Sequence, residues 1–204
     1  MSRKAVDVVL LPGEAMADKA IEANAELVKK FGGKIVLNKE DCQPHISLAM
    51  GCVYEKDIGD IGKILKAIAK RSCLGDLRVI GAAVTVNSAG EKVSAFEVEK
   101  TEELQRLHQE IMEKLEPYLS YEVRADMMAD AIVDESALAW VREYRAKSSF
   151  AKFSPHITIG YGQMGELPFP IEFGVSRVAL CHLGNHCTCR KILASAELQK
   201  QQRR

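Results

Sequence analysis

The chain has 204 residues, 47% of them hydrophobic, and its 28 lysines and arginines equal its 28 aspartates and glutamates in number. A chain of this length and apolar content can bury its own core, and its composition is not that of a disordered protein. Because the formal charge is balanced, no overall positive field exists to hold a long nucleic-acid backbone. If the substrate is RNA, we expect the protein to bind an end or a short piece rather than a duplex.

The N-terminal stretch and the six cysteines are those expected of an intracellular protein. A chain of this size can build a core without disulfides, and the N-terminal apolar stretch is too short for a secretory signal and contains Asp7. No apolar run reaches the ~18–20 residues needed to span a bilayer. We therefore expect a cytoplasmic monomer with reduced cysteines and no membrane association.

The hydrophobic pattern predicts alternating strands and helices. Residues 5–11 form an apolar strand, and residues 14–31 follow a helical period that ends at Gly32-Gly33. Because hairpins and crossover connections alternate along the chain, we expect an α+β or mixed-sheet fold. We expect a single domain made of two halves, approximately residues 1–100 and 101–204. The further expected elements are strands at 34–37 and 45–50, a helix from Ile58 to Ile68, a hairpin of 77–87 and 92–99 around Ser88-Ala89-Gly90-Glu91, helices over 101–116 and from about Asp134, and strands at 156–161, 175–183 and 188–196.

A short motif occurs twice. Pro44-His45-Ile46-Ser47-Leu48 recurs as Pro155-His156-Ile157-Thr158-Ile159, and both copies lie in apolar runs that favour strands. Because side chains alternate along a strand, each histidine shares a face with the hydroxyl residue two positions later, roughly 6–7 Å away. If the two copies lie side by side, two imidazoles and two hydroxyls meet in one cleft.

These four side chains suit the cleavage of a phosphodiester. A neutral imidazole can take a proton from an attacking water, while a protonated one gives a proton to the leaving oxygen, and histidine populates both forms near neutral pH. Hydroxyls can donate to the non-bridging phosphate oxygens. We therefore predict His45 and His156 as acid and base, in either order, and Ser47 and Thr158 as phosphate ligands, with no metal or cofactor.

The repeated motif resembles the two-histidine (2H) phosphoesterase superfamily, which includes bacterial RNA 2′,3′-cyclic phosphodiesterases and 2′-5′ RNA ligases. The resemblance extends over residues 153–160 and to Trp140 and Arg145, and the order of elements covers most of the chain. It implies two pseudo-symmetric α+β lobes around a central cleft, with RNA ends or small nucleotides as substrates and weak reverse ligation. Ser47 stands where many relatives have Thr, and Gly160-Tyr161 stands where several have Arg.

Four further residues could be either substrate-binding residues or residues with only a structural or surface role. Tyr161 is a candidate to stack on a base, although strict alternation places it on the face opposite His156. Lys152 and Arg190 are candidates to approach a phosphate, with solvated surface charge as the alternative. His108 is expected on a polar helix face.

Two other patterns compete with the motif. Residues 160–165 match a dinucleotide-binding glycine pattern, but Pro168 and Pro170 follow where a helix should open, so we predict a loop. A cluster near the C-terminus offers soft zinc ligands, although its spacing suits an ordinary hairpin. Two other classes of function stay open, a nucleotide-binding module of the same fold with little turnover and a zinc-stabilised interaction protein. The cluster consists of Cys181, His182, His186, Cys187 and Cys189.

Overall fold

The computed structural model describes residues 2–87 and 90–199. The strands are β1 (Arg3–Pro12), β2 (Ile46–Tyr54), β3 (Leu77–Val86), β4 (Lys92–Val98), β5 (His156–Tyr161), β6 (Ile171–Phe173), β7 (Val175–Leu183) and β8 (Cys189–Glu197). The α-helices are α1 (Glu14–Phe31), α2 (Ile58–Ala69), α3 (Glu102–Leu115) and α4 (Glu135–Ser148). Short 3₁₀ helices are η1 (Glu55–Asp57), η2 (Ala125–Met127), η3 (Phe150–Lys152) and η4 (Asn185–Cys187).

The strands form two four-stranded antiparallel sheets, ordered β2-β1-β7-β8 and β5-β4-β3-β6. The strands that carry the repeated motif, β2 and β5, each lie at the edge of their sheet, and they contact one another. The α+β fold with two related halves is therefore confirmed. The sheets do not divide at residue 100, because β7 and β8 return to the sheet of β1.

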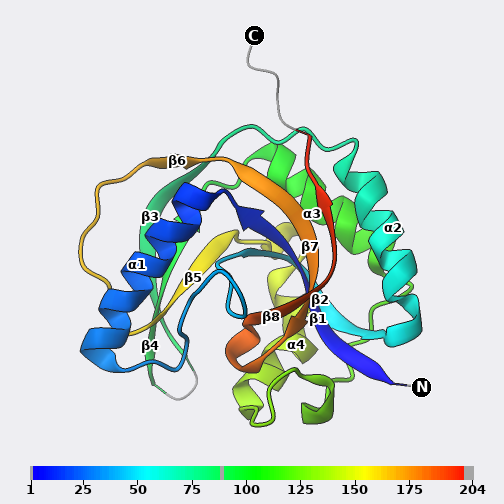
Figure 1. Cartoon of the computed structure of the whole chain (residues 1–204), viewed down its shortest axis with the longest axis horizontal. Helices are drawn as coiled ribbons and strands as arrows, with labels where there is room; N and C mark the ends of the chain where they lie inside the picture. The colour runs from blue at the N-terminus through cyan, green and yellow to red at the C-terminus, as the bar shows by residue number, and fades with distance from the viewer. Residues whose placement is uncertain (1, 88–89, 200–204) are drawn as a thin grey trace.

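The helices are exchanged between the two sheets. Helix α1 follows the first strand of one sheet but packs on β5 of the other, while α3 and α4 precede β5 but pack on β2. Figure 1 shows α1 and α2 on opposite sides of the molecule with the strands between them. Since each motif strand is covered by helices from the other half, the two halves are interlocked around the motifs.

Local sequence signals explain where the helices begin and end. Helix α3 is capped by Thr101, whose Oγ1 accepts a hydrogen bond from the backbone N of Leu104 at 3.2 Å. Helix α1 ends at Gly32, which has a positive φ of 83° and donates its N–H to the carbonyl of Val28. Both limits agree with the sequence expectation to within one residue.

The strand expected over residues 34–37 is wrong. This segment lies in an irregular loop whose Ile35 and Leu37 are nevertheless buried. The buried side chain of Asn24 satisfies its backbone, donating to the carbonyl of Ile35 at 3.0 Å and accepting from the N–H of Leu37 at 2.8 Å. An amide side chain thus takes the place of a partner strand. Of the turn expected at 88–91, residues 88–89 lie outside the described part of the chain.

Candidate functional site

Both motif strands carry a β-bulge at the same place. Val8 and Val9 pair with Ala49 and Ser47, which leaves Leu48 as the extra residue of β2. In β5 the equivalent pairs of Ser94 with Gly160 and Ala95 with Thr158 leave Ile159 as the extra residue. Each bulge therefore falls three residues after the motif histidine, so the repeat in the sequence is also a repeat in the backbone.

The bulge changes which side chains share a face. Thr158 pairs with Ala95, and Tyr161 pairs with Val93 two residues away on β4. Because Val93 and Ala95 share a face, Tyr161 lies on the same face as Thr158 and His156. The expectation from strict alternation, which placed Tyr161 on the opposite face, is wrong because the extra residue shifts the alternation by one.

Each bulge is held by a buried polar side chain from the other half. His108 of α3 makes a 2.7 Å hydrogen bond from Nδ1 to the carbonyl of Leu48. Asn24 of α1 donates Nδ2 to the carbonyl of Ile159, also at 2.7 Å. His108 is fully buried and its Nε2 accepts the backbone N–H of Phe150. The expectation that His108 lies on a polar helix face is therefore wrong, since that face is covered by β2.

The two candidate catalytic imidazoles are held alike. Nδ1 of His45 lies 2.8 Å from the carbonyl of Gln43, and Nδ1 of His156 lies 2.9 Å from the carbonyl of Ser154. A carbonyl only accepts, so Nδ1 carries the hydrogen in both rings. In the neutral form Nε2 is then an open base, and in the protonated form Nε2–H is an acid. Each ring is thus oriented by the residue before the motif proline.

The environment of His45 favours the neutral imidazole. Its side chain is only 14% exposed. Burial lowers the pKa of His45, the hydrogen bond to Gln43 opposes that shift, and the charge of His156 lowers the pKa further. The contact between β2 and β5 brings the two motifs side by side.

An aspartate not anticipated among the site residues lies beside the first motif. Oδ2 of Asp7 is hydrogen-bonded to Oγ of Ser47 at 2.5 Å and lies 3.8 Å from Nε2 of His45. Asp7 is fully buried, and burial raises its pKa well above the usual range, while hydrogen bonds from Ser47 and from the backbone of Ala49 oppose that shift. The sequence signal for it was a lone carboxyl inside an apolar strand, which is rare without a special reason.

Tyr161 reaches across to the turn between β7 and β8. Its hydroxyl lies 3.1 Å from Nδ1 of His186, and the two rings meet edge to face. His186 and Cys187 in that turn both have positive φ, at 57° and 56°. Nζ of Lys34 lies 5.0 Å from the centre of the Tyr161 ring. The turn therefore holds the hydroxyl end of Tyr161 while leaving its side chain partly exposed.

The other two proposed substrate contacts have structural partners. Nζ of Lys152 donates to the carbonyl of Ala146 near the end of α4 at 2.7 Å. Arg190 forms an ion pair with Asp130 at 3.0 Å and donates to the carbonyl of Asp41. Their role in binding substrate stays a prediction.

The expectation of reduced cysteines is wrong for one pair. Cys181 and Cys189 form a disulfide, with their Cα atoms 5.5 Å apart, because the short turn between β7 and β8 brings them together. Two members of the suggested zinc cluster are therefore joined to each other. Among residues 2–87 and 90–199, no group of three or more His, Cys, Asp or Glu side chains is placed to hold a metal ion.

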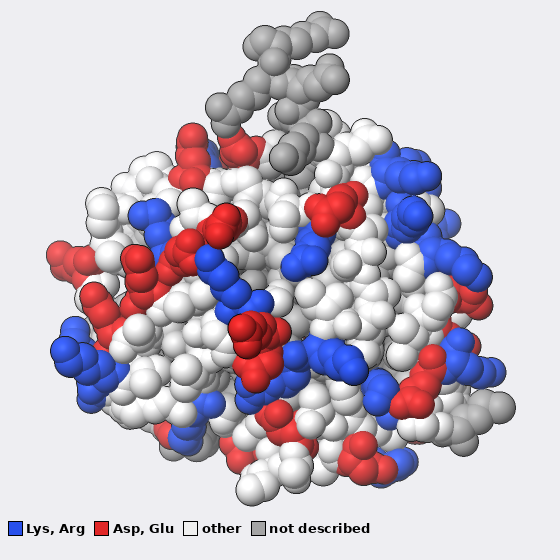
Figure 2. All heavy atoms as spheres, in the orientation of Figure 1, with Lys and Arg blue, Asp and Glu red and all other residues white. Residues whose placement is uncertain are grey.

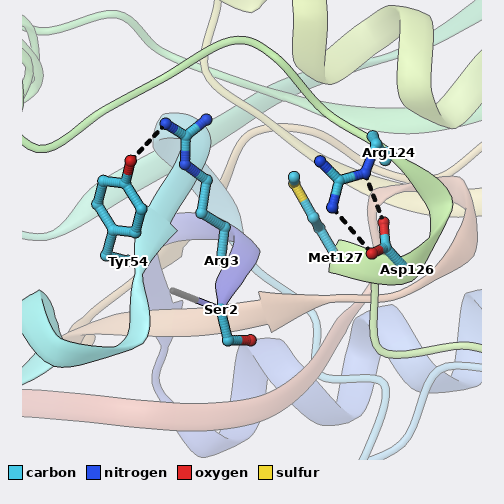
Figure 3. A pocket seen from close by; sticks show the side chains of 6 residues that line it. All are labelled: Ser2, Arg3, Tyr54, Arg124, Asp126 and Met127. Carbon is cyan, nitrogen blue, oxygen red and sulfur yellow. Dashed lines mark hydrogen bonds and ion pairs between the residues drawn. The ribbon is translucent and has the colours of Figure 1, made fainter.

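A cavity of about 410 Å³ lies away from the motifs, near the start of β1 and the end of β2. Figure 3 shows Arg3 bonded to Tyr54 and Arg124 bonded to Asp126 in its wall. His45 immediately precedes the opposite end of β2, so this cavity is separate from the candidate site. On the face in Figure 2, acidic and basic side chains of the described residues are mixed over most of the surface, and basic side chains adjoin one another at the upper right, on the side of α2.

Comparison with known proteins agrees with this geometry. A profile of the 2′-5′ RNA ligase superfamily matches residues 25–186. TT0787 of Thermus thermophilus is 18% identical and superposes with a TM-score of 0.59, over 97% of this chain and 99% of that one. E. coli LigT complexed with 3′-AMP is 12% identical, with a TM-score of 0.52 over 98% and 99% of the chains. No curated protein sequence matches.

The fold and the profile match place the chain in the 2H phosphoesterase superfamily. The chain belongs to the 2′-5′ RNA ligase superfamily, whose profile covers most of its length. None of the helices in the described part of the chain is long and apolar enough to cross a membrane.

Proposed function

We propose that this protein is a phosphodiesterase that opens a 2′,3′-cyclic phosphate on an RNA end or a nucleotide, or cleaves a 2′,5′ linkage. The observation that carries the proposal is the pair of imidazoles on adjoining edge strands, each with Nδ1 fixed by a carbonyl and Nε2 left for chemistry. Proton transfer by two positioned histidines is sufficient for such a reaction and makes no demand on a bound metal.

The electrostatics favour one division of roles. His45, whose pKa is lowered by burial, is neutral near pH 7 and takes a proton from the attacking water at Nε2. As the water oxygen bonds to phosphorus, the bond to one ribose oxygen breaks, and that oxygen receives the Nε2 proton of His156. The product is a phosphomonoester, and the two rings regain their first states by exchanging protons with solvent. Reversal of these steps re-forms the cyclic phosphate, or, for a 2′,5′ linkage, joins a phosphomonoester to a ribose hydroxyl with release of water.

The hydroxyls hold the phosphate between the rings. Ser47 and Thr158 each stand two residues beyond a motif histidine on the same face, so they can donate to the two non-bridging oxygens. As phosphorus becomes five-coordinate, the negative charge on the two non-bridging oxygens changes, and hydrogen-bond donors that are already in place stabilise that charge.

The substrate class follows from charge and from the relatives. The balanced formal charge and the mixed surface of Figure 2 favour a short RNA end or a nucleotide over a long duplex. E. coli LigT has been crystallised with 3′-AMP, a nucleotide with its phosphate on a ribose oxygen. A phosphate on one ribose oxygen is the kind of product that opening a cyclic phosphate gives.

The test is hydrolysis of 2′,3′-cyclic nucleotides, cyclic-phosphate-ended RNA and 2′,5′-oligoadenylate in EDTA. The wild type is compared with His45→Ala and His156→Ala, each expected to lose about 10²–10⁴-fold in kcat/KM. Ser47→Ala and Thr158→Ala are expected to lose less, about 10–100-fold. His182→Gln serves as the control, since His182 bonds to the carbonyl of Met127 away from the motifs.

Near-normal turnover by His45→Ala or His156→Ala would contradict the mechanism. EDTA-sensitive turnover would show that a metal takes part. If the wild type cleaves no member of the panel but binds AMP, the protein is the nucleotide-binding module of the same fold.

A further inference from the structure

Each motif and the strand paired with it form one half-site: β1 with β2 in the first, and β4 with β5 in the second. The two half-sites differ at one position beside the motif hydroxyl. Val9 and Ala95 pair with Ser47 and Thr158, and two residues earlier on β1 and β4 stand Asp7 and Val93. The first half-site therefore has a carboxyl side chain at the position where the second half-site has a valine. Because the motifs themselves are nearly identical, Asp7 makes the surroundings of the two motif hydroxyls chemically unequal.

The surroundings of Asp7 do not support a negative charge. Within the described residues no lysine or arginine pairs with it, and its ion-pair distance to His45 is 3.8 Å. Asp7 is fully buried, and burial disfavours its carboxylate form more than the hydrogen bonds from Ser47 and from the backbone of Ala49 favour it. The titratable groups around it are His45 just before β2, Tyr144 on α4, Cys187 on η4, and Cys181 on β7, which is held in the disulfide.

The short contact to Ser47 has different consequences in the two charge states. A carboxylate would take the Ser47 hydroxyl hydrogen for itself and would place a negative charge beside the phosphate. A carboxylic acid instead donates its own hydrogen to Oγ of Ser47, which frees the serine hydrogen for a phosphate oxygen. Nε2 of His45, at 3.8 Å, is too distant for a hydrogen bond, so Ser47 is the partner of the acid.

We propose that Asp7 is a positioning residue that acts as an uncharged carboxylic acid, donating to Ser47 and so turning the Ser47 hydroxyl toward the phosphate. The raised pKa of Asp7 agrees with this state. The phosphate in this scheme rests on the proposed function, whereas the protonation of the carboxyl does not. A consequence is that activity falls at alkaline pH as the acid ionises and Ser47 turns back toward it.

The first experiment needs no substrate. The infrared difference spectrum between the wild type and Asp7→Asn at pH 7 is expected to show the C=O stretch of one protonated carboxyl, which disappears as the pH is raised. If the wild type shows only carboxylate bands, the proposal is overturned. This measurement stays informative even when no phosphodiester is cleaved, so failure of the proposed function is told apart from failure of this inference.

The second experiment measures kcat/KM from pH 5 to 10. Asp7→Val, which copies the second half-site, is expected to lose about 10–100-fold, comparable to losing one hydrogen-bond donor to the phosphate. Asp7→Asn keeps the shape and an N–H donor, so it is expected to recover to within about threefold at neutral pH and to lack the alkaline decline. In a Ser47→Ala background, Asp7→Val is expected to cost less than about twofold more.

Two outcomes overturn the positioning role. One is an Asp7→Asn variant that keeps the wild-type Tm but is as slow as Asp7→Val, because the charge itself would then be required. The other is a full additional loss when Asp7→Val is added to Ser47→Ala, because Asp7 would then act independently of the serine.

Discussion

Asn24 and His108 occupy equivalent places in the two halves. Each lies on a helix that has crossed to the other half, is buried, and donates a 2.7 Å hydrogen bond to the carbonyl of the extra residue in a motif bulge. A bulge leaves backbone groups without a strand partner, and these two side chains satisfy them. The exchanged helices therefore fix the local geometry on which each histidine and hydroxyl depends.

Substituting Gly160 is expected to disturb the second bulge. Gly160 has a φ of 150°, and a Cβ added there would lie 2.9 Å from Nδ2 of Asn24. Gly160→Ala must therefore strain the backbone or displace the amide, at a cost of about 1–3 kcal/mol in the free energy of unfolding. Chemical denaturation measures this, with Gly165→Ala as the control, since nothing lies within 4 Å of a Cβ at Gly165. Equal effects of both substitutions would show that the contact with Asn24 is unimportant.

The burial of His108 is expected to make the fold sensitive to acid. Burial lowers the pKa of His108 to about 4, whereas the unfolded chain titrates near 6.5. The unfolded state therefore binds a proton first as the pH falls. The stabilisation is complete above about pH 6.5 and is lost progressively toward pH 4, by on the order of 3 kcal/mol.

The check is the free energy of unfolding between pH 7.5 and 4.5. His108→Gln is expected to be less stable at neutral pH but to have a flatter pH dependence than the wild type. His182→Gln, which removes a less buried histidine, is the matched control. Parallel pH profiles for the wild type and His108→Gln would show that another group controls acid sensitivity.

Periodicity identified the main helices and most strands because these depend on local patterns of apolar residues. It also identified the two motifs, since His45 and His156 each occur in the same short string. The bulges were hidden, because they exist only relative to a paired strand, and so was the face of Tyr161. Asp7 was missed as a site residue for the same reason: its contact with Ser47 joins residues 40 positions apart.

Tyr161 is expected to contribute to binding rather than to chemistry. It lies on the face of His156 and Thr158, its ring is partly exposed, and His186 holds its hydroxyl. Base stacking on an aromatic ring contributes about 1–3 kcal/mol. Tyr161→Ala is therefore expected to raise KM for a cyclic nucleotide about tenfold with little change in kcat, whereas Tyr161→Phe keeps the wild-type KM. Steady-state kinetics decide, and a selective fall in kcat for Tyr161→Ala would contradict a stacking role.

The disulfide between Cys181 and Cys189 is expected to support both stability and the first half-site. Closing so short a loop stabilises a fold by about 2–3 kcal/mol in the chain-entropy account. The carbonyl of Cys189 also accepts the N–H of Gln43 at 3.4 Å, and the carbonyl of Gln43 orients His45. Cys181→Ala is therefore expected to lower the Tm and to reduce kcat/KM severalfold.

Cys73→Ser is the control for this substitution, because Cys73 is exposed and unpaired. Alkylation of the unreduced, unfolded protein followed by intact-mass measurement tests the bond directly. Four of the six cysteines are expected to be modified, namely Cys42, Cys52, Cys73 and Cys187. Modification of all six would show that the pair is reduced, and any loss of stability in Cys181→Ala would then come from a cavity on the face of β7 that packs against Val9.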